Sequence, residues 1–333
     1  MREECDVLVV GLGPAGSAAA TAAQRGGLHV VAVERKSRPG HSAHSEDSEP
    51  RQGWISSGWL KGSNTNDPGA FVDRHSLDQS LMEIAREAGC DIRLGTPLDG
   101  LRPDLDVALL RHGDRTSEMH YRFLIAADGP QSDVSRTLGL PALDVLVTHQ
   151  YAVSLSRPRE HVDVFVSSAI PGAHAWLVPH GPDQASLGLA MPSGTAMECR
   201  RVLDHLHMHL QLSGQTGASV MRQVGGLIPA SGLRERLVED RILFAGDAAG
   251  LAHPITGLGV PSAVISGETA GEICVAAQVS NAELSEYERV IRARFGPALE
   301  RGVKLRQRLK QAWADDEIHP NGGHWHVVAE LPV

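Results

Sequence analysis

The sequence has few aromatic residues and no long run of positive charge. Phe, Trp and Tyr together make up 4% of the 333 residues, too few for a platform on which the bases of a single nucleic-acid strand could stack. The 31 basic residues are outnumbered by 40 acidic ones, which gives a formal net charge of −9. This balance argues against a nucleic-acid backbone as a partner, so we expect no nucleic-acid ligand.

Cysteines are also few, and no uninterrupted apolar segment is long enough to span a membrane. The four cysteines show no metal-ligand spacing, and no signal peptide precedes the first predicted strand, so we expect a cytoplasmic protein without disulfides. His205 and His209 are four residues apart, but no acid or cysteine completes a metal site, and we predict none. The longest charge-free stretch, residues 248–267, contains two prolines and four glycines, which excludes a transmembrane helix there.

Glycine, in contrast, is abundant, with 35 residues, and it is clustered. The first cluster follows a short apolar run, residues 4–10, and precedes an alanine-rich helical segment; a second apolar run, residues 28–33, ends in Glu34. This order predicts a strand, a tight turn, a helix and a strand, with the phosphates of a dinucleotide at the helix N-terminus and the acid on a ribose. The predicted cofactor-binding residues are Gly11, Gly13, Pro14, Ala15, Gly16, Glu34 and Arg35. Either NAD or FAD fits this unit.

A second glycine-rich element decides between the two cofactors. Residues 241–250 read as a buried strand running into Gly-Asp-Ala-Ala-Gly, and Pro254-Ile255-Thr256-Gly257-Leu258-Gly259 follows. This element resembles the flavoprotein superfamily of the p-hydroxybenzoate-hydroxylase type, which includes geranylgeranyl reductases, flavin-dependent halogenases and aromatic hydroxylases. The resemblance implies FAD, with Gly246 and Asp247 at the ribityl chain and phosphate. It also implies that Pro254, Gly257, Leu258 and Gly259 lead into a helix whose N-terminus stabilises negative charge on the flavin.

A third element supports the same superfamily. The run from Ala126 to Arg136 resembles the Asp-Gly element that lies beside FAD in this family and is linked to NAD(P)H binding, which makes Asp128 a cofactor residue. Ser135 stands where the first arginine of the usual pair is found. We therefore expect NAD(P)H to bind only transiently, or a reduced partner protein such as a flavin reductase to supply electrons. Arg74 matches a family arginine that opens a helix close to FAD; a solvent-facing helix start is the alternative.

The reaction itself stays open between several branches of the superfamily. Gly250 and the run from His174 to Pro179 resemble the reductases, but residues 40–69 lack the cysteine that reductases usually carry there. We predict first an FAD-dependent monooxygenase acting on an aromatic or electron-rich organic substrate. A carbon–carbon double-bond reductase, a halogenase and a flavin-binding protein without turnover are the alternatives. His253, His174 and Trp176 are the candidate catalytic residues, although packing within the sheet is favoured over a pocket wall for Trp176.

The predicted fold is α/β, a Rossmann-like three-layer FAD-binding domain with an inserted antiparallel β-sheet substrate domain. The FAD-binding domain would comprise residues 1–40, 70–145 and 225–285, the substrate domain 41–69 and 146–224, and a C-terminal helix and tail 286–333. The polar, glycine-rich segment 40–69 predicts a mobile lid or an open rim. A substrate held on a carrier protein or within a polypeptide would fit such a rim.

Overall fold

The computed structural model describes residues 3–37, 52–55, 70–167, 170, 174–192, 196–314 and 326–332. The chain divides into two compact units by its internal contacts. The first unit comprises Met1–Gly40, Val72–Asp144 and Pro229–Arg301; the second comprises His41–Phe71, Val145–Ile228 and Gly302–Val333. The predicted lid lies outside the described residues, apart from a short strand at residues 52–55.

The first unit is built on an eight-stranded sheet whose main path runs β14-β15-β8-β1-β2-β5. Five strands, β15, β8, β1, β2 and β5, run parallel, while β14 and the β6–β7 hairpin pair antiparallel with their neighbours. The strands are β1 (Glu3–Val10), β2 (Val30–Glu34), β5 (Asp91–Leu94), β6 (Leu98–Arg102), β7 (Val107–His112), β8 (Arg115–Ala126), β14 (Val238–Glu239) and β15 (Ile242–Phe244). The continuous apolar runs in β1 and β2 are buried, as expected for central parallel strands covered on both faces.

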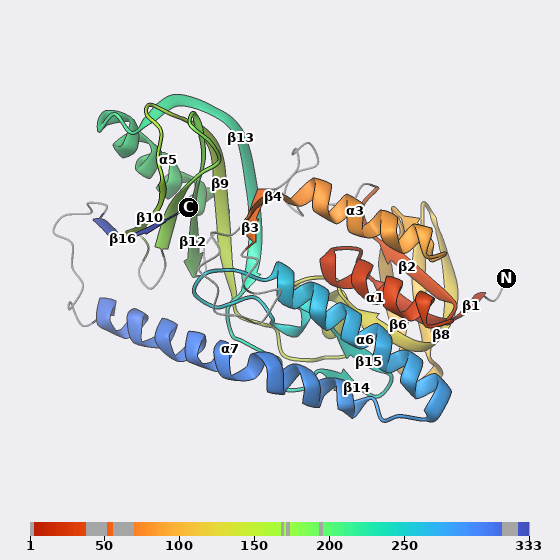
Figure 1. The fold of residues 1–333 in the computed structure, drawn as a ribbon. Coiled ribbons are helices and arrows are strands. Elements are labelled where there is room, and N and C mark those ends of the chain that lie inside the picture. Colours follow the sequence, from red (N-terminus) through yellow and green to blue (C-terminus); the bar gives the residue numbers. More distant parts are fainter. Residues whose placement is uncertain are drawn as a thin grey trace. The chain divides into compact units, whose positions relative to one another are not determined.

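Helices α1, α3 and α6 of this unit lie side by side (Figure 1). The helices of the unit are α1 (Pro14–Arg25), α3 (Arg74–Glu87), α4 (Asp133–Thr137), α6 (Val260–Ser280) and the first part of α7 (Ser285–Ala314), with short 3₁₀ turns η1 (Pro103–Leu105) and η2 (Gly246–Ala249). Helices α1 and α6 approach backbone to backbone. A Cβ atom at Gly267 would lie 2.0 Å from the Ala15 carbonyl oxygen, and one at Gly271 would lie 2.6 Å from that of Ala19. The contact therefore requires glycine at both α6 positions.

The second unit is a six-stranded sheet of order β13-β9-β12-β11-β10-β16, in which the registered pairs run antiparallel. Its strands are β9 (Val145–Leu155), β10 (His161–Val166), β11 (His174–Pro179), β12 (Gln184–Pro192), β13 (Thr216–Pro229) and β16 (His326–Pro332), and its helix is α5 (Ala196–Leu212). A further pair is formed by β3 (Gln52–Ile55) and β4 (Ala70–Asp73). One face of the sheet packs on the buried side of α5 through Tyr151, Leu177, Leu187 and Leu203.

This combination of a parallel Rossmann-like sheet with a separate antiparallel sheet confirms the predicted α/β fold class. The sequence did not predict β13, because its glycines and exposed polar residues give no clear alternation. Within the described chain, no helix combines the length and the apolar character that crossing a bilayer requires.

Candidate functional site

The candidate site lies at the carboxyl edge of the parallel sheet in the first unit. Strands β2, β1, β8 and β15 end there at one level. Three backbone hydrogen bonds tie the ends together: Gly11 N–H to Val33 O at 2.8 Å, Ala127 N–H to Val10 O at 2.8 Å, and Ala245 N–H to Ala126 O at 2.9 Å. In the sheet order β14-β15-β8-β1-β2-β5, the chain that leaves β1 returns in β2 on one side, while the chain that leaves β8 returns to the sheet on the other side, in β14 and β15. Open α/β sheets bind ligands at such switch points.

The turn after β1 uses its three glycines differently. Gly11 has φ +95°, and a Cβ atom there would lie 2.5 Å from the Ala127 carbonyl oxygen; a Cβ atom at Gly16 would lie 1.8 Å from the Gly11 oxygen. Both glycines are thus required by the protein's own packing. At Gly13, apart from its two chain neighbours, no atom of the residues that the structure describes lies within 4 Å of the corresponding position. The space in front of Gly13 is therefore free for a ligand that approaches the backbone.

Glu34 closes the next loop along the edge. Its carboxylate accepts hydrogen bonds from Leu12 N–H at 3.0 Å and Lys36 N–H at 3.1 Å, which places it against the glycine turn. Arg35 follows it and is exposed. Pro14 and Ala15 begin α1 and are buried. Glu34 and the glycine turn thus lie together at the sheet edge, and Arg35 is the next residue along the chain.

Asp128 follows β8 and carries an unsatisfied oxygen. Its Oδ2 accepts the Val134 N–H at 3.1 Å, while Oδ1 is buried without a hydrogen-bond partner among the described residues. Burial raises the pKa of this carboxyl, and the hydrogen bonds to Ser132 and Val134 oppose the rise. A buried acceptor without a partner is costly, so a donor from a bound molecule would stabilise it.

The turn after β15 is held from several sides. Gly246 N–H donates to Ser266 Oγ of α6 at 3.0 Å, and Tyr287 Oη of α7 donates to the Phe244 carbonyl at 2.7 Å. Arg234 is only 6% exposed, and its Nε donates to the Ala248 carbonyl at 2.5 Å. Its Nη1 also donates to Pro141 O at 2.8 Å, and the guanidinium lies 5.2 Å from the centroid of the Phe244 ring.

The loop between this turn and α6 closes on His253. The His253 N–H donates to Leu258 O at 2.8 Å, and Gly257 N–H donates back to His253 O at 2.9 Å. The ring Nδ1 lies 3.4 Å from Ile255 N and 3.3 Å from Thr256 N. Burial alone lowers the pKa of His253, which favours the neutral imidazole.

Helix α6 begins immediately after this loop, and Gly259 is its N-cap. A Cβ atom at Gly259 would lie 3.2 Å from Asp247 Oδ1, so the Asp247 side chain sits beside the first turn of the helix. Pro254, Gly257 and Leu258 lie in the same loop. The structure thus brings the second predicted cofactor element to the same sheet edge as the first.

Arg74 and the two candidates of the second unit have defined local partners. Arg74 begins α3 and makes a two-pronged ion pair with the buried carboxylate of Asp78, with both contacts at 3.1 Å. In β11, Trp176 lies over Gly188 of β12, where a Cβ atom would be 2.5 Å from the ring, and its Nε1 donates to Gln150 Oε1 at 3.4 Å. His174 lies 5.8 Å from Trp176 between ring centroids, and burial lowers its pKa.

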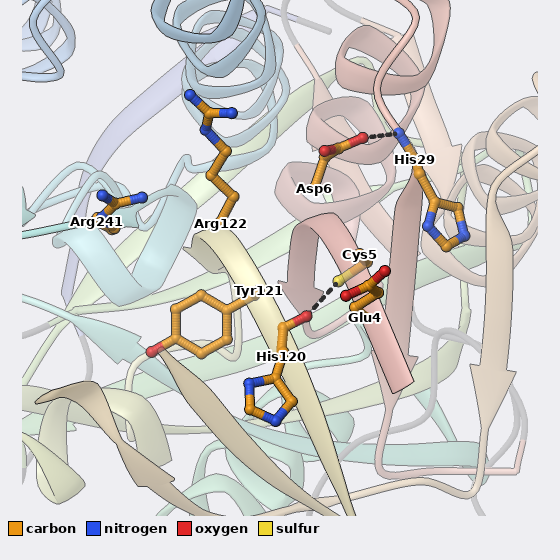
Figure 2. Close-up of a pocket in the computed structure, with 8 residues that line it drawn as sticks. All are labelled: Glu4, Cys5, Asp6, His29, His120, Tyr121, Arg122 and Arg241. Carbon is orange, nitrogen blue, oxygen red and sulfur yellow. Dashed lines mark hydrogen bonds between the residues drawn. The ribbon is translucent and has the colours of Figure 1, made fainter. Parts of the chain in front are cut away.

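A cavity of about 450 Å³ lies elsewhere in the first unit (Figure 2). It is open at the amino ends of the parallel strands, the edge opposite the candidate site, and none of the predicted site residues lines it. Its walls are Glu4, Cys5, Asp6, His29, His120, Tyr121, Arg122 and Arg241. A dashed line in Figure 2 marks the hydrogen bond in which the Asp6 carboxylate accepts the backbone N–H of His29. The two atoms are 2.8 Å apart.

Comparison with known families agrees with this geometry. Family models described as FAD binding domain match residues 68–277 and residues 6–49. The chain belongs to the FAD-binding domain family. It is an FAD-dependent oxidoreductase of the superfamily that the three sequence elements predict.

The proteins to which this chain is similar include reductases and a hydroxylase. Digeranylgeranylglycerophospholipid reductase 1 of Methanopyrus kandleri is 34% identical over 307 residues, which cover 82% of this chain and 81% of that protein. A geranylgeranyl bacteriochlorophyll reductase-like protein of Thermoplasma acidophilum superposes with a TM-score of 0.78 at 24% identity, covering 93% and 88% of the two chains. The anhydrotetracycline hydroxylase OxyS of Streptomyces rimosus gives 0.67 at 19% identity, covering 94% and 71%. At these identities the two structures show the fold alone.

The residues of the first unit fit FAD. The open position at Gly13 leaves room for a pyrophosphate, and the buried Asp128 Oδ1, which has no hydrogen-bond partner among the described residues, can accept a hydrogen bond from the cofactor. Glu34 already stands at the turn where a ribose would lie. Sequence reasoning missed three residues that hold this site: Arg234, Ser266 and Tyr287. No local pattern marks them, because an isolated Arg, Ser or Tyr in a polar or helical run is normal at a surface.

Proposed function

We propose that this protein is an FAD-dependent reductase that saturates carbon–carbon double bonds in an isoprenoid chain. The similarity to a digeranylgeranylglycerophospholipid reductase, 34% identity across four-fifths of both chains, carries the proposal. It reverses the order of the sequence-based hypotheses, which placed hydroxylation first. The likeness to a hydroxylase stands at 19% identity and supports only the shared fold.

Gly250 supports the same branch. The residue has φ +81°, and a Cβ atom there would lie 2.0 Å from the Gly232 carbonyl oxygen, so no side chain fits without moving the backbone. The superfamily resemblance places histidine here in many hydroxylases and glycine in the prenyl reductases. The packing around Gly250 excludes the hydroxylase residue from this chain.

Under this proposal the first unit holds FAD and the antiparallel sheet of the second unit holds the substrate. When bound, FAD supplies the two-electron chemistry of hydride transfer. The glycine turn would accept the pyrophosphate, Glu34 would bind a ribose, and Asp128 and Asp247 would bind polar groups of the cofactor. The N-terminus of α6 favours negative charge in front of it. Reduction of each double bond consumes two electrons and two protons and forms two C–H bonds.

The electron donor is part of the proposal. Ser135 stands at the position of a family arginine, and it is buried within α4, where its N–H donates to Ser132 Oγ at 3.0 Å. A buried serine offers no charge to a nicotinamide dinucleotide phosphate. We therefore favour a reduced partner protein, such as a flavin reductase, over tight NAD(P)H binding.

The test is an anaerobic turnover experiment. The holoprotein is reduced with dithionite and mixed with a geranylgeranyl-bearing glycerophospholipid in detergent micelles, and the lipid is analysed by mass spectrometry. We expect flavin reoxidation together with a gain of two hydrogen atoms per double bond. A protein that reduces no double bond under anaerobic conditions, but adds one oxygen atom to the substrate when oxygen is admitted, would instead be a hydroxylase. Halide dependence of the product would establish the halogenase.

A further inference from the structure

His253 organises the loop that leads into α6. Two backbone hydrogen bonds, His253 N–H to Leu258 O and Gly257 N–H to His253 O, close the loop into a ring. The imidazole also holds the loop, because its Nδ1 accepts hydrogen bonds from the N–H groups of Ile255 at 3.4 Å and Thr256 at 3.3 Å. Thr256 Oγ1 in turn accepts the Leu258 N–H at 3.3 Å.

These contacts fix the chemical state of the ring. Two N–H donors point at Nδ1, so this atom presents its lone pair and the ring proton is on Nε2. An acceptor that bonds the N–H groups two and three residues ahead is the arrangement that Asn, Asp and Ser side chains make in turns. The His253 imidazole therefore makes the same hydrogen bonds as the side chain of a turn-forming Asn or Asp.

We propose that His253 is a positioning residue, which holds the loop 254–258 in the shape that presents Gly257, Leu258, Gly259 and the first turn of α6 to the flavin. The inference rests on the proposed location of FAD at this sheet edge. It assigns His253 a task that needs a hydrogen-bond acceptor and no proton transfer. The acid–base role expected from the sequence requires the opposite, a group that gives up and regains its proton.

Two substitutions separate the roles. His253→Asn places a carbonyl oxygen where Nδ1 lies, the same number of bonds from the backbone, and removes the titratable ring. His253→Leu keeps a comparable volume and removes the acceptor. The readout is FAD affinity, measured by titrating apoprotein with FAD and following flavin fluorescence, together with the rate of anaerobic alkene reduction.

We expect His253→Leu to weaken FAD binding by about tenfold or more, as the loss of two ordinary hydrogen bonds predicts. His253→Asn should stay within about threefold of the native protein in both measurements. Should the Leu protein fail to fold, His253→Gln, whose amide lies one bond too far out, is measured in its place with the same expectation.

Three results would overturn the inference. Native FAD affinity in the Leu or Gln variant would show that the loop does not need the side chain. An Asn variant as slow as the Leu variant, with native FAD affinity, would make the imidazole a proton donor. Gly13→Ala, which closes the open position at the pyrophosphate, serves as the control for the location of FAD. If Gly13→Ala binds FAD with native affinity, FAD does not bind at the proposed site. If Gly13→Ala loses FAD affinity, the site is supported and the other two results decide the role of His253.

Discussion

Arg234 offers the sharpest test of how the candidate site is held together. Its guanidinium is buried and, among the described parts of the chain, has no carboxylate in direct contact; it bonds instead to the carbonyls of Ala248 and Pro141 and lies against the Phe244 ring. Burial lowers its pKa, and the charge of Asp128 partly compensates. Arg234→Met keeps much of the apolar stem and removes every one of these polar contacts.

The magnitude follows from opposing contributions. Two hydrogen bonds from a charged donor are each worth about 1.5–3 kcal/mol, and the contact with the Phe244 ring adds about 1 kcal/mol. Removing the cation also removes its desolvation cost, which is several kcal/mol. These hydrogen-bond values already include the cost of leaving the buried Ala248 carbonyl without its donor, and the carbonyl of the exposed Pro141 can bond to water instead. We expect a net loss of about 3 kcal/mol in the free energy of unfolding.

The measurement is urea unfolding of the apoprotein followed by far-UV circular dichroism, so that FAD binding does not contribute. A loss of about 3 kcal/mol lowers the midpoint by about 1–2 M at an ordinary denaturant slope. Arg236→Met is the matched control, because Arg236 lies two residues away, its side chain is 70% exposed, and its partner Glu239 is 3.5 Å distant. It should change the stability by less than about 0.5 kcal/mol. Equal midpoints for the two variants would refute the reasoning.

The remaining predictions concern glycine packing and pH. Gly13→Ala should fold with native stability and yet lose FAD, while Gly16→Ala, whose methyl group would meet the Gly11 oxygen, should cost about 3 kcal/mol in thermal melts of the apoprotein. Burial and the charge of Arg222 lower the pKa of His180 to about 4, so the unfolded chain binds a proton that the folded one does not. The contribution of neutral His180 to stability should be fully present above pH 6.5 and should be lost between pH 6.5 and 4. His180→Gln should therefore flatten the decline of the melting temperature over this range. An unchanged decline would contradict the assignment.

Much of the fold follows from local patterns. The first strand, turn and helix are legible because Gly11, Gly13 and Gly16 stand between an apolar run and an alanine-rich segment. Short alternating runs such as that around Trp176 predict the antiparallel strands correctly. The turn at Gly246 is equally visible, since glycine follows a buried strand there.

The parts that sequence reasoning missed depend on contacts between distant residues. Arg234 stands in a polar run with Glu235 and Arg236 and looks like a surface residue, yet it is buried by segments around residues 141 and 248. The monooxygenase placed first among the reaction classes stays unconfirmed, and the similarity to reductases favours the alternative. The missing cysteine in residues 40–69 argued against a reductase, although that segment carries less information than the similarity of the whole chain.

The backbone contact between α1 and α6 has a consequence for how the protein is made. The two helices are separated by more than 200 residues, so the α6-facing side of α1 has no cover while the ribosome synthesises everything between them. The second unit's strands β9 to β13 emerge in that interval. The side of α1 that will later contact α6 consists mainly of alanines, among them Ala15, Ala19 and Ala22. Their small side chains expose little apolar area to other nascent chains. The small residues at this contact thus allow close helix packing in the folded protein and limit the exposed apolar area during synthesis.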